Sequence, residues 1–144
     1  MRILGLDLGQ KRIGVAISDP LGITAQGLEV ISCVDRQLAV DRILKICRQY
    51  GVEKIVVGLP LRLDGTRGSA AEAAEQFKYL LAKTTGLPAV SVDERLTSKA
   101  AEQALLEGDV RRKNRKAVRD MLAAVLILDT YLRMSKTSRG VNAD

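Results

Sequence analysis

Two apolar runs separated by a short polar turn open the chain. The runs cover residues 2–8 and about 13–19, and the sequence GQKR lies between them. Apolar runs of this length, bounded by turn residues, are typical of buried β-strands, and so short a connection indicates an antiparallel hairpin. A fold for this chain therefore has to contain an antiparallel pair of strands at its N-terminus.

Strands and helices alternate along the rest of the chain. The elements expected after the hairpin are a strand at 23–31, a helix at 35–50 ended by Gly51, a strand at 54–60, a helix at 69–85, a strand at 89–92, and helices at 97–107 and 117–134. Residues 61–69 are predicted to form an exposed loop. This order predicts an α/β fold with a five-stranded mixed sheet and helices on both faces.

The length and composition favour one domain. The 144 residues, 47% of them apolar, suffice for one hydrophobic core, and we expect a single domain at 1–134 with a polar, flexible tail at 135–144. No apolar stretch approaches the roughly 20 residues that a membrane span needs. The chain has two cysteines and no CxxC pair, which disfavours zinc and indicates reduced thiols. These features predict a cytoplasmic protein without a membrane partner.

Histidine is absent from the sequence. This removes the commonest general base and every imidazole metal ligand. If the chain is a hydrolase, its carboxylates, its lysines or an activated water must handle the protons.

The carboxylate of Asp7 interrupts the first apolar run. A buried charge is costly unless it is paired or binds a cation. Two interpretations fit: Asp7 accepts hydrogen bonds from the amides of its own turn, or it is a metal ligand. Gly9 would allow close approach of a phosphate to the backbone, and Lys11 and Arg12 would add positive charge.

The segment VDERLTS, residues 92–98, holds a second group of charges after a strand. A capped helix start explains its threonine and serine but not Asp93 and Glu94 together with Arg95. Adjacent carboxylates repel, and a divalent cation would relieve the repulsion. Because parallel strands end at one edge of a sheet, Asp7 and Glu94 are expected to share that edge.

The last predicted helix offers two further carboxylates, Asp120 and Asp129. Helical spacing places each of them beside apolar neighbours and does not decide between them, although the alanines near Asp120 favour it. A site built from Asp7, Glu94 and Asp120 would hold its ion with oxygen ligands alone. Such a set favours Mg²⁺ or Mn²⁺ over zinc.

A basic stretch precedes the same helix, and the chain has a formal net charge of +6. Such a stretch is usually a solvated surface, but beside a carboxylate cluster it favours contact with a nucleic-acid backbone. Its members are Arg111, Arg112, Lys113, Arg115, Lys116 and Arg119.

Four segments together resemble the YqgF/RuvX family of pre-16S ribosomal RNA nucleases, once named Holliday junction resolvases. They are LDLGQKRIGVAISD, VVGLPLRLDGTRG, VDERLTS and KAVRDMLAAVLILDTYL, in this order along the chain. The resemblance implies an RNase H-like fold of the kind seen in RuvC-type resolvases. It also implies that Asp7, Glu94 and Asp120 are the catalytic, metal-binding carboxylates, which selects Asp120 over Asp129.

The function implied by the resemblance is metal-dependent endonucleolytic cleavage in 5′-end processing of pre-16S ribosomal RNA. The expected substrate-binding residues are Lys11, Arg12, Arg95, Arg111, Arg112, Lys113 and Lys116. Resolution of branched DNA is the alternative, ribosomal proteins are candidate partners, and both a monomer and a homodimer remain open.

Two other classes of protein share some of these features. The D-x-G turn also resembles the phosphate loop of actin-like ATPases, but those need two such domains around the nucleotide. A non-catalytic nucleic-acid-binding module would account for the positive charge, but it would not need three carboxylates.

The basic stretch generates a prediction about salt dependence. Replacing Arg111, Arg112 and Lys113 together with glutamine should reduce the slope of log affinity for nucleic acid against log salt by about 2, because three phosphate contacts no longer release counterions. Fluorescence anisotropy titrations at several salt concentrations measure the slope. An unchanged slope would show that the stretch is a solvated surface.

Overall fold

The computed structural model describes residues 1–60, 64–66, 68–94 and 115–142, and within the last range the side chains of 121–135. Its strands are β1 (Arg2–Leu8), β2 (Arg12–Ser18), β3 (Ala25–Ser32), β4 (Val52–Leu59) and β5 (Ala89–Asp93). Its helices are α1 (Arg36–Tyr50), α2 (Ser69–Thr85) and α4 (Arg115–Asn142).

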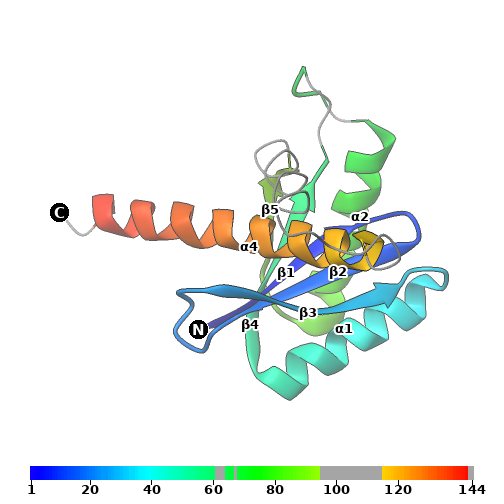
Figure 1. The fold of residues 1–144 in the computed structure, drawn as a ribbon, viewed down its shortest axis with the longest axis horizontal. Helices are drawn as coiled ribbons and strands as arrows, with labels where there is room; N and C mark the ends of the chain where they lie inside the picture. The colour runs from blue at the N-terminus through cyan, green and yellow to red at the C-terminus, as the bar shows by residue number, and fades with distance from the viewer. Residues whose placement is uncertain (61–63, 67, 95–114, 143–144) are drawn as a thin grey trace.

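The strands form one mixed sheet in the order β3-β2-β1-β4-β5. β1, β2 and β3 pair antiparallel through the N-terminal hairpin, whereas β4 and β5 run parallel to β1. Figure 1 shows this sheet with helices on its two sides. The predicted α/β fold with a five-stranded mixed sheet is confirmed.

Each face of the sheet buries its own core, because successive strand residues point to opposite sides. Leu4 and Leu6 of β1 pack with α1 and α2 in the larger core. Ile3 of β1 and Val56 of β4 pack with α4 on the other face. The helices therefore cover both faces, as the alternation of elements in the sequence predicted.

Local signals in the sequence account for the ends of α1. The carboxylate of Asp35 accepts hydrogen bonds from the backbone amides of Gln37 (3.0 Å) and Leu38 (3.2 Å) and so caps the first turn. Gly51 ends the helix in the left-handed conformation, with φ of 66°, which glycine adopts without steric cost.

Helix α4 corrects one expected boundary. It runs from Arg115 to Asn142, so the predicted helix end at residue 134 is wrong. No glycine or proline occurs between Arg115 and Gly140 that would stop the helix. Its C-terminal part extends beyond the sheet (Figure 1). The single domain at 1–134 and the flexibility of 135–144 stay predictions.

The structure describes part of the predicted 61–69 loop but not the helix expected at 97–107. Asp64 and Thr66 of the predicted 61–69 loop are exposed. The helix expected at 97–107 lies outside the described residues, as does most of the basic connection. Among the helices that the structure describes, none has the length and apolarity to cross a bilayer. The cytoplasmic location stays a prediction.

Helix α4 approaches the backbone of β1 closely at Gly5. A Cβ atom at this position would lie 2.7 Å from the Cβ of Leu128 and 3.2 Å from the carbonyl oxygen of Ala124. These separations are shorter than van der Waals contact, so only glycine fits. The absent side chain thus sets the distance between α4 and the sheet.

A methyl group at Gly5 should therefore separate α4 from β1. Gly5→Ala is expected to lower the free energy of unfolding by about 1–3 kcal/mol, the usual range for overpacking a core. Gly27→Ala is the matched control, because its Cβ would meet Met121 of the same helix at 3.5 Å, an ordinary contact. Urea denaturation compares the two, and equal stability of both variants would contradict the close approach.

Candidate active site

The carboxyl ends of three parallel strands meet at one edge of the sheet. β1 pairs with β4 through Leu6 and Val57, and β4 pairs with β5 through Leu59 and Asp93. Asp7 is the next-to-last residue of β1, and Glu94 directly follows β5. The structure therefore places Asp7 and Glu94 at the same edge, as expected from the sequence.

Asp7 faces α4. Residues two apart in a strand share a face, and Ile3 and Gly5, which precede Asp7 at that spacing, both contact the α4 side. Leu8 alternates to the opposite face, where it packs against the larger core. Asp7 is half-buried at this edge. Its carboxylate is thus directed toward the helix that carries Asp120.

Glu94 reaches the same face over Gly58. A Cβ at Gly58 would lie 3.6 Å from the carboxyl carbon of Glu94 and 2.5 Å from Cδ1 of Ile127 in α4. Gly58 follows Val57, the partner of Leu6, and so lies level with Asp7 in the neighbouring strand. The missing side chain of Gly58 therefore leaves the space that Glu94 and Ile127 share.

Asp93 does not lie on the same face of the sheet as Glu94, although the sequence suggested that the two adjacent carboxylates repel each other. In β5, Val92 packs toward α4, whereas Ser91 contacts Lys78 and Glu75 of α2 on the other face. Strand alternation places Asp93 with Ser91. The two adjacent carboxylates thus belong to opposite faces, and relief of their mutual repulsion is not the reason to expect a cation here.

The two carboxylates of α4 lie at different places. Asp120 is part of the helix, one turn before Ala124, whose carbonyl oxygen lies over Gly5. Its side chain lies outside the described residues. Asp129 forms an ion pair with Arg133 at 3.0 Å and lines a cavity with Met1 and Ile3, at the amino end of β1. Asp129 is therefore remote from Asp7.

The β1–β2 turn adds positive charge beside Asp7. The amide of Gly9 donates to the carbonyl oxygen of Arg12 at 2.9 Å, and a Cβ at Gly9 would lie 2.6 Å from that oxygen. The amide of Cys33 donates to the carbonyl oxygen of Lys11 at 2.8 Å and ties the end of β3 to the turn. The turn is thus tightly held, with Lys11 exposed and Arg12 half-buried.

The remaining predicted binding residues are not placed. Arg95, Arg111, Arg112 and Lys113 lie outside the described residues, and Lys116 lies in α4 without a described side chain. Within the described part of the chain, no group of three or more acidic or cysteine side chains is placed to hold a metal. Asp120 as the third ligand of Asp7 and Glu94 stays a prediction.

Sequence reasoning missed the glycine that accommodates Ile127 beside Glu94. Gly58 interrupts the apolar run KIVVGLP, which was a visible sign of close approach in a buried strand. Its partner Ile127 had no such signal, because a buried isoleucine in an amphipathic helix looks the same whatever it contacts.

Comparison with known proteins gives consistent matches over most of the chain. Residues 1–134 match the family RuvX, described as Holliday junction resolvase. A Listeria monocytogenes protein named "Putative pre-16S rRNA nuclease" is 52% identical over 134 residues, covering 92% of this chain and 97% of its own. A Pelotomaculum thermopropionicum protein of the same name is also 52% identical, covering 92% of this chain and 86% of its own.

Solved structures match the fold at low sequence identity. RuvC of T. thermophilus, in complex with a Holliday junction substrate, has a TM-score of 0.62 at 19% identity, covering 94% of this chain and 96% of its own. The fowlpox virus Holliday junction resolvase has a TM-score of 0.59 at 14% identity, covering 93% and 99%. These matches confirm the RNase H-like fold.

The contact between Gly58 and Ile127 can be tested by a double-mutant cycle. Gly58→Ala should lower the free energy of unfolding by about 1–3 kcal/mol, because its methyl group overlaps Cδ1 of Ile127. Ile127→Val removes that atom, so the double variant should lose less than the sum of the two single losses. Urea denaturation measures all three variants. Strict additivity would show that the two residues are not in contact.

Proposed function

The chain belongs to the RuvX family, and on that premise we propose that it is a metal-dependent endonuclease that hydrolyses phosphodiester bonds of precursor 16S ribosomal RNA. The family and its relatives are nucleases by name, which supports a hydrolase. The matched family is described as Holliday junction resolvase, but RNA is favoured over DNA because the relatives named for pre-16S rRNA are 52% identical, whereas the solved resolvases with bound branched DNA are 19% identical or less. Resolution of branched DNA is the second candidate.

One observation carries this proposal. Asp7 lies in β1 and Glu94 directly follows β5, yet they share one edge and one face of the sheet, directed toward α4. Two carboxylates held close together repel each other unless a proton or a cation lies with them. A fold that places both at one half-buried edge and on one face is therefore suited to hold a cation between them.

The donor atoms fit a hard divalent ion. Asp7, Glu94 and Asp120 would hold Mg²⁺ or Mn²⁺ through carboxylate oxygens alone, the ligands that these ions prefer. The carboxyl carbon of Glu94 lies over Gly58, 3.6 Å from where a Cβ would be, on the α4 side of the sheet. When bound, such an ion supplies activation of a water molecule and stabilisation of the leaving oxygen in phosphodiester hydrolysis.

The protein's own residues would bind and orient the substrate. Lys11 lies in the turn that follows Asp7, and Arg12 begins β2 directly after it, so both cations lie beside the proposed ion site, where phosphates of the substrate would bind. The backbone hydrogen bonds of that turn keep these two residues in place relative to Asp7. Arg95, Arg111, Arg112, Lys113 and Lys116 are proposed to extend the contact along the strand.

The carboxylates are tested by isosteric substitution. Asp7→Asn, Glu94→Gln and Asp120→Asn should each reduce Mn²⁺-dependent cleavage of labelled pre-16S RNA to background. In EDTA each should be as stable as the wild type or slightly more stable, because one charge is removed from a repelling group. Thermal melts give the stability, and Mn²⁺ at 100 times its Kd should stabilise the wild type by about 2.7 kcal/mol but the variants less.

Asp129→Asn is the matched control on α4. It removes only the ion pair with Arg133, an exposed contact worth about 0.3–0.5 kcal/mol, and cleavage should be retained. An Asp7→Asn variant that still cleaves with Mn²⁺ and melts well below the wild type in EDTA would identify Asp7 as a structural residue. Removing the carboxylate of such an aspartate leaves the backbone amides that donate to it without an acceptor, which lowers the free energy of unfolding by about 1–3 kcal/mol.

A further inference from the structure

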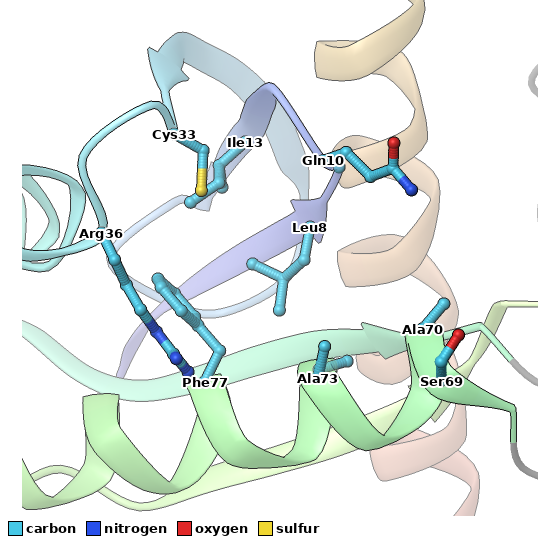
Figure 2. Close-up of a pocket in the computed structure, with 11 residues that line it drawn as sticks. Leu8, Gln10, Ile13, Cys33, Arg36, Ser69, Ala70, Ala73 and Phe77 are labelled. Carbon is cyan, nitrogen blue, oxygen red and sulfur yellow. The ribbon is translucent and has the colours of Figure 1, made fainter.

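A pocket lies at the same edge of the sheet on the face opposite to Asp7 and Glu94. Its volume is about 460 Å³, and its walls come from the β1–β2 turn, the start of α1 and the N-terminal half of α2. We call it the edge pocket. Figure 2 shows the residues around it, which include Leu8, Ile13, Cys33, Arg36, Ala73 and Phe77.

The edge pocket adjoins the candidate active site through consecutive residues. Leu8 follows Asp7 in β1 and points to the pocket face, and Gly9 of the turn also lines the pocket. A nucleic-acid strand whose phosphate lies at Asp7 therefore has to cross only the β1–β2 turn to place a neighbouring nucleotide at the pocket. Lys11, exposed in that turn, would meet the connecting phosphate.

The chemistry of the pocket walls combines an aromatic ring, a cation and small side chains. The guanidinium carbon of Arg36 lies 5.5 Å from the centre of the Phe77 ring, and Figure 2 shows the two side chains next to each other. Ala73 leaves room along α2, and the hydroxyl of Ser69 lies at the helix start. The Phe77 ring is buried, so the group that the pocket offers to a base is the exposed guanidinium of Arg36 supported on that ring, and unstacked bases of RNA stack on arginine planes of this kind.

We propose that the edge pocket binds one unstacked base of the strand that is cleaved at Asp7 and Glu94, and so selects the cleavage position. This inference rests on the proposed function. The pocket lies within the 300–1,000 Å³ range of small-molecule sites, which is ample for one base. The positive charge of Arg36 and the net charge of +6 complement a polyanion, and this favours a nucleic acid over an apolar protein segment.

Cys33 provides a reporter inside the pocket. It is half-buried in the pocket wall, whereas Cys47, the other cysteine, is buried in the larger core. Burial raises the pKa of the Cys47 thiol to about 11, so this thiol is almost entirely protonated and unreactive at pH 8. Alkylation by iodoacetamide at pH 8 should therefore modify Cys33 alone, and a bound base should slow it.

The experiment measures this alkylation by mass spectrometry in the full-length Asp7→Asn protein, which leaves the RNA intact. A single-stranded RNA of mixed sequence, at saturation by anisotropy, should slow modification of Cys33 at least tenfold. An abasic oligonucleotide of equal length, also at saturation, should slow it less than twofold. Equal protection by both would overturn the inference, as would protection that rises with protein concentration without RNA, which indicates a second copy of the chain.

A pocket-filling variant provides the second arm. Ala73→Leu keeps a good helix former at an exposed position of α2 and fills the pocket. It should abolish the tenfold difference between the two oligonucleotides, whereas Gln76→Leu, on the same helix outside the pocket, should preserve it. A base-dependent effect that survives Ala73→Leu would contradict the inference.

Cleavage by the wild type with Mn²⁺ is scored separately. Cleavage without base-dependent protection of Cys33 overturns the role of the pocket and leaves the proposed nuclease function intact. Base-dependent protection without cleavage refutes the proposed nuclease function and the role of the pocket in selecting a cleavage position, and leaves only the binding of a base.

Discussion

The close packing of α4 on β1 and β4 is the contact on which the arrangement of the site depends. At Gly5 the helix lies so near the strand that a Cβ would overlap Leu128, and at Gly58 a Cβ would overlap Ile127. A larger residue at Gly5 would push against the backbone of the helix, whereas a larger residue at Gly58 would displace the end of the Ile127 side chain beside Glu94. The two glycines thus convert an ordinary helix–sheet contact into a defined distance between the acidic edge and α4.

The alternation of side chains along β1 divides the edge between two roles. Asp7 is directed to the α4 side and Leu8 to the α1–α2 side, and the tight turn that follows them carries Lys11 and Arg12. The candidate ion site and the edge pocket are therefore built from consecutive residues of one strand. A strand of nucleic acid that contacts the first would have to cross the β1–β2 turn to reach the second.

Local patterns in the sequence predicted the elements well, and tertiary contacts account for what they missed. Asp35 and Gly51 delimit α1 through interactions within a few residues, so both ends were predictable. The helix end at 134 was wrong because polarity after residue 134 was taken as a stop, although no helix-breaking residue occurs before Gly140.

The separation of Asp93 from Glu94 depends on strand alternation in β5 and the contacts of Ser91. Asp129 lies beside Met1 because α4 crosses the sheet as far as the amino end of β1. Helical periodicity gives the face of a helix on which a residue lies, but it does not give the position of the helix on the sheet.

The central claim is that Asp7 and Glu94 bind one and the same divalent ion. Isothermal titration of Mn²⁺ into the wild type, Asp7→Asn, Glu94→Gln and the double variant tests it most directly. Each single substitution should weaken Mn²⁺ binding at least tenfold. The double variant should lose far less affinity than the product of the two single effects, because either substitution alone already removes the ion. Mn²⁺ binding by Asp7→Asn that equals the wild type would contradict this claim.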